Sequence, residues 1–133
     1  MTLTLENTPQ LVQTPTVEHY FQTFNQGDFL KTSQLFAATG QLLPPFEDPI
    51  VGQSAIHLYL EREASNMQAM PQEVSVQTWV GDRQQITVKG SVKALVFKVN
   101  AAWIFELDPQ GKIEQVEVKL LASLQELLTL RPA

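Results

Sequence analysis

The chain has 133 residues, a formal net charge of −5 and no cysteine. Its length is typical of one domain with its own core, and the absence of cysteine excludes disulfides and thiolate chemistry. The acidic balance without a basic stripe argues against nucleic acids and anionic membranes as partners. No apolar run reaches the roughly 20 residues of a membrane span, and the first ten residues lack a secretory pattern. We therefore expect a cytoplasmic protein without stable membrane insertion.

The first third of the chain predicts two helices. Residues 1–13 show no sustained period and are interpreted as a flexible tail or docking arm, whereas residues 14–133 are expected to form one domain. Thr14 and Pro15 are typical of a helix start. Gly27 should end this helix, and a short helix over 29–36 should follow, capped by Asp28. The apolar face of the first helix is expected at Val17, Tyr20, Phe21 and Phe24.

The middle of the chain predicts a short strand, a loop and a third helix. The strand at Leu42 and Leu43 should end at Pro44, and the proline-rich residues that follow are predicted to be a loop. The third helix should begin within residues 52–54 and end at Pro71. Its apolar positions at helical spacing are Ile56, Tyr59, Leu60, Ala64 and Met67.

From residue 74 onward the apolar period changes to two, which predicts four consecutive strands. Helices followed by a run of strands favour an α+β fold: a cone-shaped, strongly curved antiparallel sheet with the N-terminal helices packed on it. Such a sheet encloses an apolar hollow suited to a small molecule. Ser123 is expected to cap a last helix over 124–130 that covers the sheet or the hollow. In the strand over 97–107 the apolar face carries Phe97, Val99, Ala101, Trp103, Phe105 and Leu107.

Trp103 is the candidate functional residue on that face. Its indole N–H needs an acceptor when it is buried. The acceptor is either a neighbouring protein carbonyl, which spacing alone favours, or the oxygen of a bound ligand. Met67 and Met70 have the same two interpretations, because methionine fills cores and also lines pockets for large apolar ligands.

The strand positions that are predicted to face the hollow carry almost no side chain that could act as an acid or a base. Glu114 is the one acid that shares the phase of Val116 and Val118. His19 and His57 have no partner at metal-ligand spacing, and His57 with Glu61 is expected to be a surface pair. The sequence therefore favours a binding protein over an enzyme.

These features belong to a wider resemblance. From about residue 17 to 128 the chain resembles the C-terminal domain of the orange carotenoid protein family, which has the nuclear-transport-factor-2-like fold. The stretches that carry the resemblance are residues 43–46, 49–52, 70–71, 100–103, 109–113, 120–123 and 126–128. It implies a cyanobacterial, photoprotective carotenoid-binding protein.

The resemblance also implies particular site residues. Trp103 would donate a hydrogen bond to the keto oxygen of a ketocarotenoid of the echinenone or canthaxanthin type, which need not be bound in the purified protein. The family's second donor, a tyrosine, is matched here to Thr23, and Tyr20 lies one turn earlier as a substitute. The apolar walls of the site are expected at Met67, Met70, Val92, Phe97, Val99 and Val118.

The resemblance further implies partners. Glu63 matches an acid that bridges to an arginine of the family's helical domain. That domain is absent from this sequence, so the chain resembles stand-alone homologues that carry carotenoids, exchange them with helical carotenoid proteins and quench singlet oxygen. A C40 carotenoid is longer than one domain with a radius of gyration of roughly 14 Å can enclose, so we expect a homodimer that shares one pigment.

Two alternatives stay open on the same fold. One is an isomerase or dehydratase of the ketosteroid-isomerase type, with Glu114 as its buried carboxylate. The other is a dimeric interaction module with a filled core. An acidic side chain facing the hollow would favour the first, and the absence of a cavity beside Trp103 would favour the second.

Overall fold

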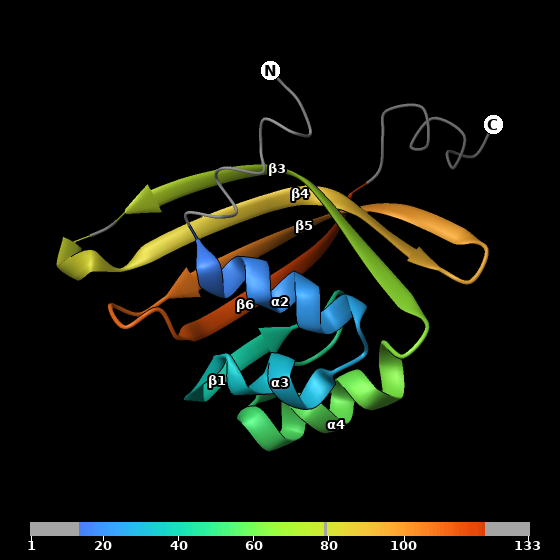
Figure 1. Ribbon diagram of the computed structural model, residues 1–133, viewed down its shortest axis with the longest axis horizontal. Helices are drawn as coiled ribbons and strands as arrows, with labels where there is room; N and C mark the ends of the chain where they lie inside the picture. Colours follow the sequence, from blue (N-terminus) through green and yellow to red (C-terminus); the bar gives the residue numbers. More distant parts are fainter. Residues whose placement is uncertain (1–13, 79, 122–133) are drawn as a thin grey trace.

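A strongly curved sheet of six strands arches over the first described helix (Figure 1). The structure is a computed structural model that describes residues 14–78 and 80–121. The helices are α2 (Pro15–Asn25), α3 (Phe29–Gln34) and α4 (Gln53–Glu63). The strands are β1 (Phe36–Leu43), β2 (Ile50–Val51), β3 (Met67–Thr78), β4 (Gln84–Ala94), β5 (Phe97–Leu107) and β6 (Ile113–Leu121).

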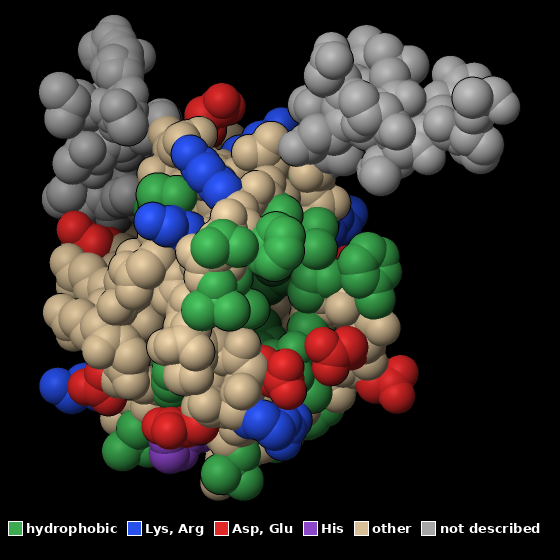
Figure 2. Space-filling model, turned by 90° about the vertical axis from the view of Figure 1, so that its right-hand side faces the viewer, with side chains coloured by type: hydrophobic (Ala, Val, Ile, Leu, Met, Phe, Trp, Pro, Cys, Tyr) green, Lys and Arg blue, Asp and Glu red, His purple; other side chains and the backbone are tan. Residues whose placement is uncertain are grey.

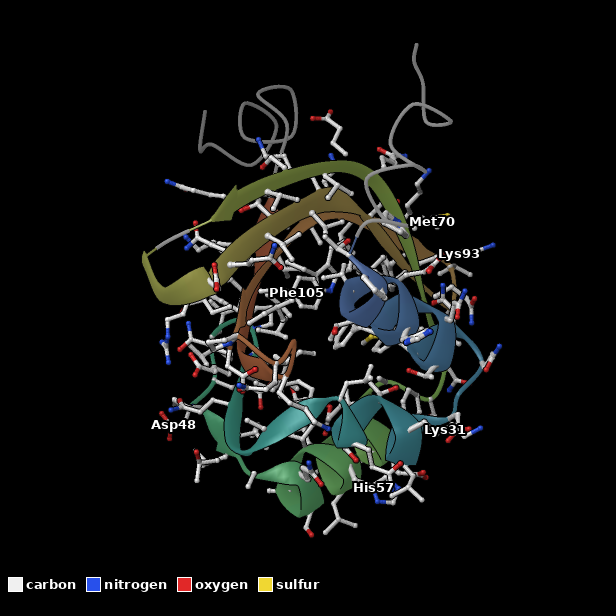
Figure 3. All side chains as sticks on the ribbon, turned by 60° about the vertical axis from the view of Figure 1, so that its left-hand side comes forward. Lys31, Asp48, His57, Met70, Lys93 and Phe105 are labelled. Carbon is white, nitrogen blue, oxygen red and sulfur yellow. The ribbon has the colours of Figure 1, made fainter. Side chains whose placement is uncertain are left out.

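The sheet has the order β2-β1-β6-β5-β4-β3, and the helices lie on its concave side (Figures 1 and 3). This arrangement confirms the predicted α+β fold with a curved sheet and helices from the N-terminal half. The sheet differs in one respect from the antiparallel one expected: β1 and β6 pair in parallel, so the sheet is mixed. The expected tail over 1–13 and the helix over 124–130 with its cap at Ser123 lie outside the described residues.

The first two helices follow their sequence signals. The apolar face of α2 is buried as predicted, and Gly27 after its end has a φ of 75°, a left-handed conformation that glycine adopts without strain. The Asp28 carboxylate accepts a hydrogen bond from the Lys31 backbone N–H at 3.3 Å and thereby caps α3. The prediction was wrong about the end of α3. This helix stops at Gln34 because the backbone of Leu35 and Phe36 is engaged by the distant residue Ile113.

β1 is longer than the predicted strand at Leu42 and Leu43. It begins at Phe36, where it pairs with Ile113 of β6, and the expected loop contributes β2, which pairs with β1. Both pairings join segments that are far apart or very short. The intrinsic strand propensity of these residues therefore did not predict either pairing.

The third helix was predicted too long. α4 ends at Glu63, and Met67 already opens β3, where it pairs with Ala94. Pro71 lies inside β3 and not at a helix end. The strand tolerates proline because the register shifts between Pro71 and Glu73, which is the bulge position where a proline fits into a sheet.

Asn25 joins the end of α2 to β3. Its side-chain oxygen accepts from the Ala69 N–H at 2.7 Å, and its side-chain nitrogen donates to the Ala69 carbonyl at 2.9 Å. We expect Asn25→Ala to lower the free energy of unfolding by about 2 kcal/mol, because both backbone groups of Ala69 lose their partners. Urea unfolding measures this change, with Gln22→Ala on the exposed side of α2 as the control. Equal midpoints for the two variants would contradict this role of Asn25.

β5 has the bounds that the period-two pattern predicts, and the expected turn follows it, closed by a hydrogen bond from the Gly111 N–H to the Asp108 carbonyl at 2.9 Å. Ala101, Trp103, Phe105 and Leu107 are buried, whereas Phe97 is exposed. The apolar face of β5 therefore runs from the core at one end to the protein surface at the other. Among the described helices none is long and apolar enough to cross a membrane.

Candidate functional site

A cavity of about 380 Å³ lies on the concave side of the sheet. Its walls come from α2, α4, the end of β1 with the segment after it, and the four strands from β3 to β6. Nearly all of the side chains around it are apolar. They are Tyr20, Phe24, Leu42, Pro44, Pro45, Phe46, Glu47, Tyr59, Leu60, Glu63, Ala64, Met67, Val92, Ala94, Phe97, Val99, Trp103, Val118 and Leu120.

Trp103 is fixed at the inner wall of this cavity. On β5 it pairs across the sheet with Val88 and Val118, and its ring and that of Phe21 form a T-shaped contact at a centroid distance of 5.0 Å. The side chain is buried, with 3% of the residue exposed. Its indole N–H has no hydrogen-bond partner among the described residues. The interpretation of Trp103 as a core residue bonded to a neighbouring carbonyl is therefore not what the structure shows.

Tyr20 brings a second donor to the same cavity. Its ring meets Phe105 edge-on at 5.0 Å and stacks on Phe24 at 6.1 Å, so its position is set by α2 packing on β5. Its hydroxyl also lacks a hydrogen-bond partner within the described part of the chain. Burial raises the pKa of this hydroxyl well above its usual value, so it stays protonated and can donate.

Both donors are still accessible from the cavity. The only fully enclosed side-chain polar atom without a partner, within residues 14–78 and 80–121, is the hydroxyl of Ser91. The polar atoms of Trp103 and Tyr20 are thus not sealed in packing. An apolar cavity with two unpaired donors suits a largely apolar molecule that carries an oxygen acceptor at the end it inserts.

Thr23 and Met70 do not reach the cavity. The Thr23 hydroxyl lies 2.7 Å from the Thr32 hydroxyl and donates to the His19 carbonyl at 2.8 Å, so it joins α2 to α3. Met70 points to the outer side of the sheet near Lys93, as Figure 3 shows. Of the two candidates for the second donor, the structure brings Tyr20 to the cavity, and not Thr23.

The other predicted wall residues lie together in the cavity lining: Met67, Val92, Phe97, Val99 and Val118. Sequence reasoning did not include Ala94 and Leu120, although they share the strand phases of Val92 and Val118. It also did not include Phe46, which follows two prolines in a segment without any period. Phe46 is 95% exposed and has a φ of 63°, which is unusual for a residue with a side chain.

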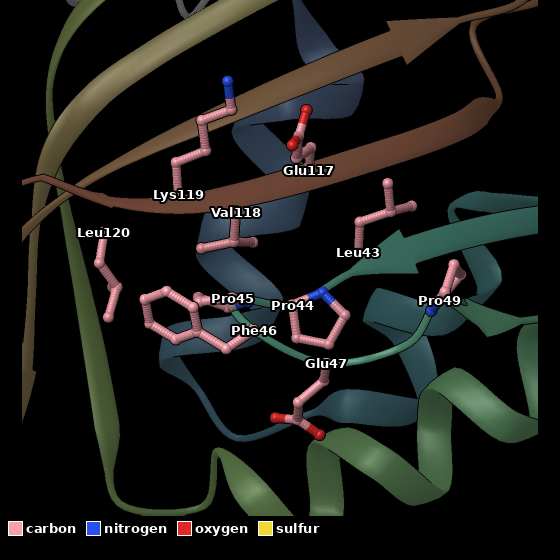
Figure 4. Close-up of a pocket in the computed structure, with 10 residues that line it drawn as sticks. All are labelled: Leu43, Pro44, Pro45, Phe46, Glu47, Pro49, Glu117, Val118, Lys119 and Leu120. Atoms are coloured by element: carbon pink, nitrogen blue, oxygen red, sulfur yellow. The ribbon is translucent and has the colours of Figure 1, made fainter.

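The mouth of the cavity is apolar and open. Figure 2 shows hydrophobic side chains gathered around a hollow on this face, with acidic side chains along one side of it. The apolar lining residues that are also exposed are Phe46, Phe97, Val99 and Leu120. A neighbouring pocket of about 460 Å³ shares Phe46, Val118 and Leu120 with the cavity, so the two hollows meet at this rim (Figure 4).

A polar cluster borders one side of the open mouth. The Tyr59 hydroxyl donates to the Glu47 carboxylate at 2.9 Å, and the Arg62 side chain pairs with Glu63 at 3.1 Å. Burial first, and the bond to Glu47 second, raise the pKa of Tyr59, so this group stays protonated as well. The cluster ties the segment after β1 to α4 and places both carboxylates at the rim and not at the inner wall.

Glu114 is not at the cavity. The register of β6 shifts at its start, so Ile113 and Val116 are both buried and Glu114 between them turns away from their face. Its carboxylate pairs with Arg83 at 2.6 Å. The expectation that Glu114 shares the phase of Val116 was wrong because of this bulge. His57 pairs with Glu61 at 3.2 Å on the surface of α4, as expected.

Comparisons with known proteins agree with this geometry. Residues 12–116 match the nuclear transport factor 2 (NTF2) domain. The chain is 36% identical over 121 residues to an orange carotenoid-binding protein of Synechocystis sp. and 36% identical over 123 residues to that of Limnospira maxima. These matches cover 88% and 90% of the chain but only 38% and 39% of the two proteins.

One solved structure extends the comparison to three dimensions. It is the Orange Carotenoid Protein of Anabaena (Nostoc) sp. binding canthaxanthin, which superposes with a TM-score of 0.79 at 37% identity. The match covers 88% of this chain and 38% of that protein. The resemblance expected from the sequence is therefore confirmed at the level of the family and the fold.

Proposed function

Since this chain belongs to the nuclear transport factor 2 (NTF2) domain family, we propose that its apolar cavity binds the end ring of a ketocarotenoid. The similarity to orange carotenoid-binding proteins, one of which binds canthaxanthin, supports this ligand class. The protein would act as a carotenoid carrier in the cytoplasm and not as an enzyme. The isomerase alternative requires Glu114 as a carboxylate in the cavity. Glu114 instead forms an ion pair with Arg83 away from the cavity.

The observation that carries the proposal is the pair of unpaired donors in the cavity. The indole N–H of Trp103 and the hydroxyl of Tyr20 would bind the keto oxygen, while Met67, Val92 and Val118 would contact the ring and the first part of the polyene. A carbonyl that leaves water needs such donors, because an unpaired buried polar group is costly.

The dimensions of the cavity support a shared ligand. About 380 Å³ is near the lower end of the range for pockets that enclose a drug-sized molecule, so a C40 chain must leave through the mouth. Phe46, Phe97 and Leu120 would contact the emerging polyene, and a second copy would cover its other half as a symmetric dimer. Exchange of the pigment with a helical carotenoid protein and quenching of singlet oxygen are part of the proposal.

Glu63 is the proposed contact for the exchange partner. It is exposed at the cavity rim and pairs with Arg62 of its own helix. An arginine of the partner would take the place of Arg62 next to this carboxylate. The partner would thereby be held beside the opening through which the pigment leaves.

The proposal is tested by producing the protein in cells that make canthaxanthin and, separately, in cells that make β-carotene. We expect a coloured protein from the first host, with a carotenoid absorbance band that stays with the protein during gel filtration. β-Carotene lacks the keto oxygen and gives the donors nothing to bind, so it should be retained at least about tenfold less well. A colourless product from the canthaxanthin host would overturn the proposal.

A further inference from the structure

The hairpin between β4 and β5 exposes three consecutive apolar side chains. Ala94 pairs with Phe97, and Leu95 and Val96 form the turn between them. Leu95 is 73% exposed, Val96 is 90% exposed and Phe97 is 69% exposed. Phe97 also lines the cavity, so the tip of this hairpin lies at the cavity mouth.

Local folding does not account for the residues of this tip. Leu95 has a φ of 56°, at the first position of a two-residue hairpin turn, where glycine or asparagine is the usual choice. At the base of the tip Lys93 is directly opposite Lys98, and like charges in such a cross-strand pair repel each other. The hairpin thus keeps apolar and cationic residues at positions where the isolated turn would favour others.

The charge of the hairpin differs from that of the whole chain. The two strands and their turn, residues 84–107, contain Lys89, Lys93 and Lys98 and a single acid, Glu106, at the end far from the tip, whereas the chain has a net charge of −5. None of these three lysines has an ion-pair partner within the described part of the chain. Figure 3 shows the Lys93 side chain directed away from the body of the protein.

We propose that residues 95–97 dock on the surface of an anionic lipid bilayer. The three apolar side chains enter the boundary between head groups and acyl chains, and Lys93 and Lys98 contact the lipid phosphates. An apolar tip flanked by lysines is what this boundary accommodates. This inference goes beyond the proposed function, because it concerns the empty protein. It would place the cavity mouth against the phase in which a hydrocarbon ligand dissolves.

The docking is expected to be weak and reversible. Three side chains bury little apolar area, and the overall negative charge of the protein repels the same lipids at long range. Lys93 and Lys98 are attracted to the anionic membrane surface over about a Debye length. Binding to the membrane should therefore weaken as the salt concentration rises. The acidic balance of the whole chain argues against anionic membranes, and the hairpin is proposed as a local exception because its tip carries lysines and no acid.

Flotation of the empty protein with vesicles tests the proposal. Vesicles of phosphatidylcholine and phosphatidylglycerol in equal parts should carry the protein upward at low salt. Val96→Asp should reduce the bound fraction about tenfold or more, because it puts a charge where an apolar side chain is buried. Leu58→Asp on α4 is the matched control, since Leu58 is a similarly exposed aliphatic residue outside the hairpin. The double variant Lys93→Gln, Lys98→Gln should lose roughly tenfold in binding to the same vesicles.

A label at the tip gives a second readout. The chain contains no cysteine, so Val96→Cys accepts a single polarity-sensitive fluorophore, and Gln77→Cys near the far end of β3 serves as the control position. With anionic vesicles the emission of the label at residue 96 should shift to the blue, and that at residue 77 should not.

Three results would overturn the proposal. One is a wild-type protein that does not float with anionic vesicles. Another is an equal loss of binding in Val96→Asp and Leu58→Asp. The third is concentration-dependent self-association of the wild type that Val96→Asp abolishes, together with no vesicle binding, which would assign the tip to contacts between two copies. Each experiment uses protein without pigment, so its outcome is independent of whether a ketocarotenoid binds.

Discussion

Trp103→Phe should release a bound ketocarotenoid about tenfold to a hundredfold faster than the wild type and shift its absorbance to shorter wavelength. Phenylalanine keeps an aromatic ring against Phe21 but removes the indole N–H. The ligand carbonyl then loses a hydrogen bond inside the cavity, at a cost of about 1 to 3 kcal/mol. The measurement is pigment transfer to an excess of acceptor liposomes, followed by absorbance, on canthaxanthin-loaded protein.

Two further variants sharpen this result. Tyr20→Phe should produce a similar but separate loss, and the double variant should retain little pigment. Thr23→Val is the matched control, because the Thr23 hydroxyl is already bonded to Thr32 and to the helix backbone. Unchanged release and an unchanged spectrum in Trp103→Phe would mean that Trp103 does not hold the ligand. A loss in Thr23→Val as large as that in Tyr20→Phe would instead favour Thr23 as the second donor.

Gly90→Ala should destabilise the fold by about 3 kcal/mol or more. A methyl group at this position would overlap the Met70 carbonyl oxygen and would lie 2.9 Å from the Pro71 Cα. Both atoms belong to the backbone of β3 at its bulge, so neither can move without disrupting the pairing of β3 with β4. Thermal and urea unfolding, followed by circular dichroism, measure the change.

Gly27→Ala separates this steric effect from backbone strain. Gly27 has open space around its Cα but a φ of 75°, so alanine there should cost only about 1 kcal/mol. Equal stability of Gly90→Ala and Gly27→Ala would mean that the close approach of β3 is not the reason why position 90 requires glycine.

The elements with a sustained period were predictable from the sequence. β5 alternates apolar and mixed residues over its whole length, and its bounds and its Trp103 face follow from that alternation alone. Helix α2 is equally clear, because its start and end signals flank one apolar face. Around Met67 the spacing fits both a helix and a strand, and only the pairing with Ala94 decides between them.

The site was predictable where it follows from strand phase. Trp103, Val92 and Val118 can be placed in the cavity by counting along a strand. Phe46 lines the cavity from a loop, where it follows two prolines and has a left-handed backbone conformation that no period predicts. Thr23 was expected at the site because the family resemblance matches it to a donor tyrosine. The sequence does not tell that its hydroxyl bonds back to its own helix, as threonine often does. Glu114 was misplaced because a bulge, which no local pattern reveals, reverses the phase at the start of β6.

The parallel pairing of β1 with β6 also bears on how fast the molecule folds. β3 to β6 are linked by short turns and can form by successive local zippering, but β1 must find a strand near the other end of the chain. The Lys112 side chain, for example, donates to the Gln34 carbonyl across 78 positions of sequence. Closing so large a loop is entropically expensive and slows the rate-limiting step. The wall that Leu42 and Phe46 contribute is therefore expected to assemble last, so the pigment chamber is completed only as folding ends.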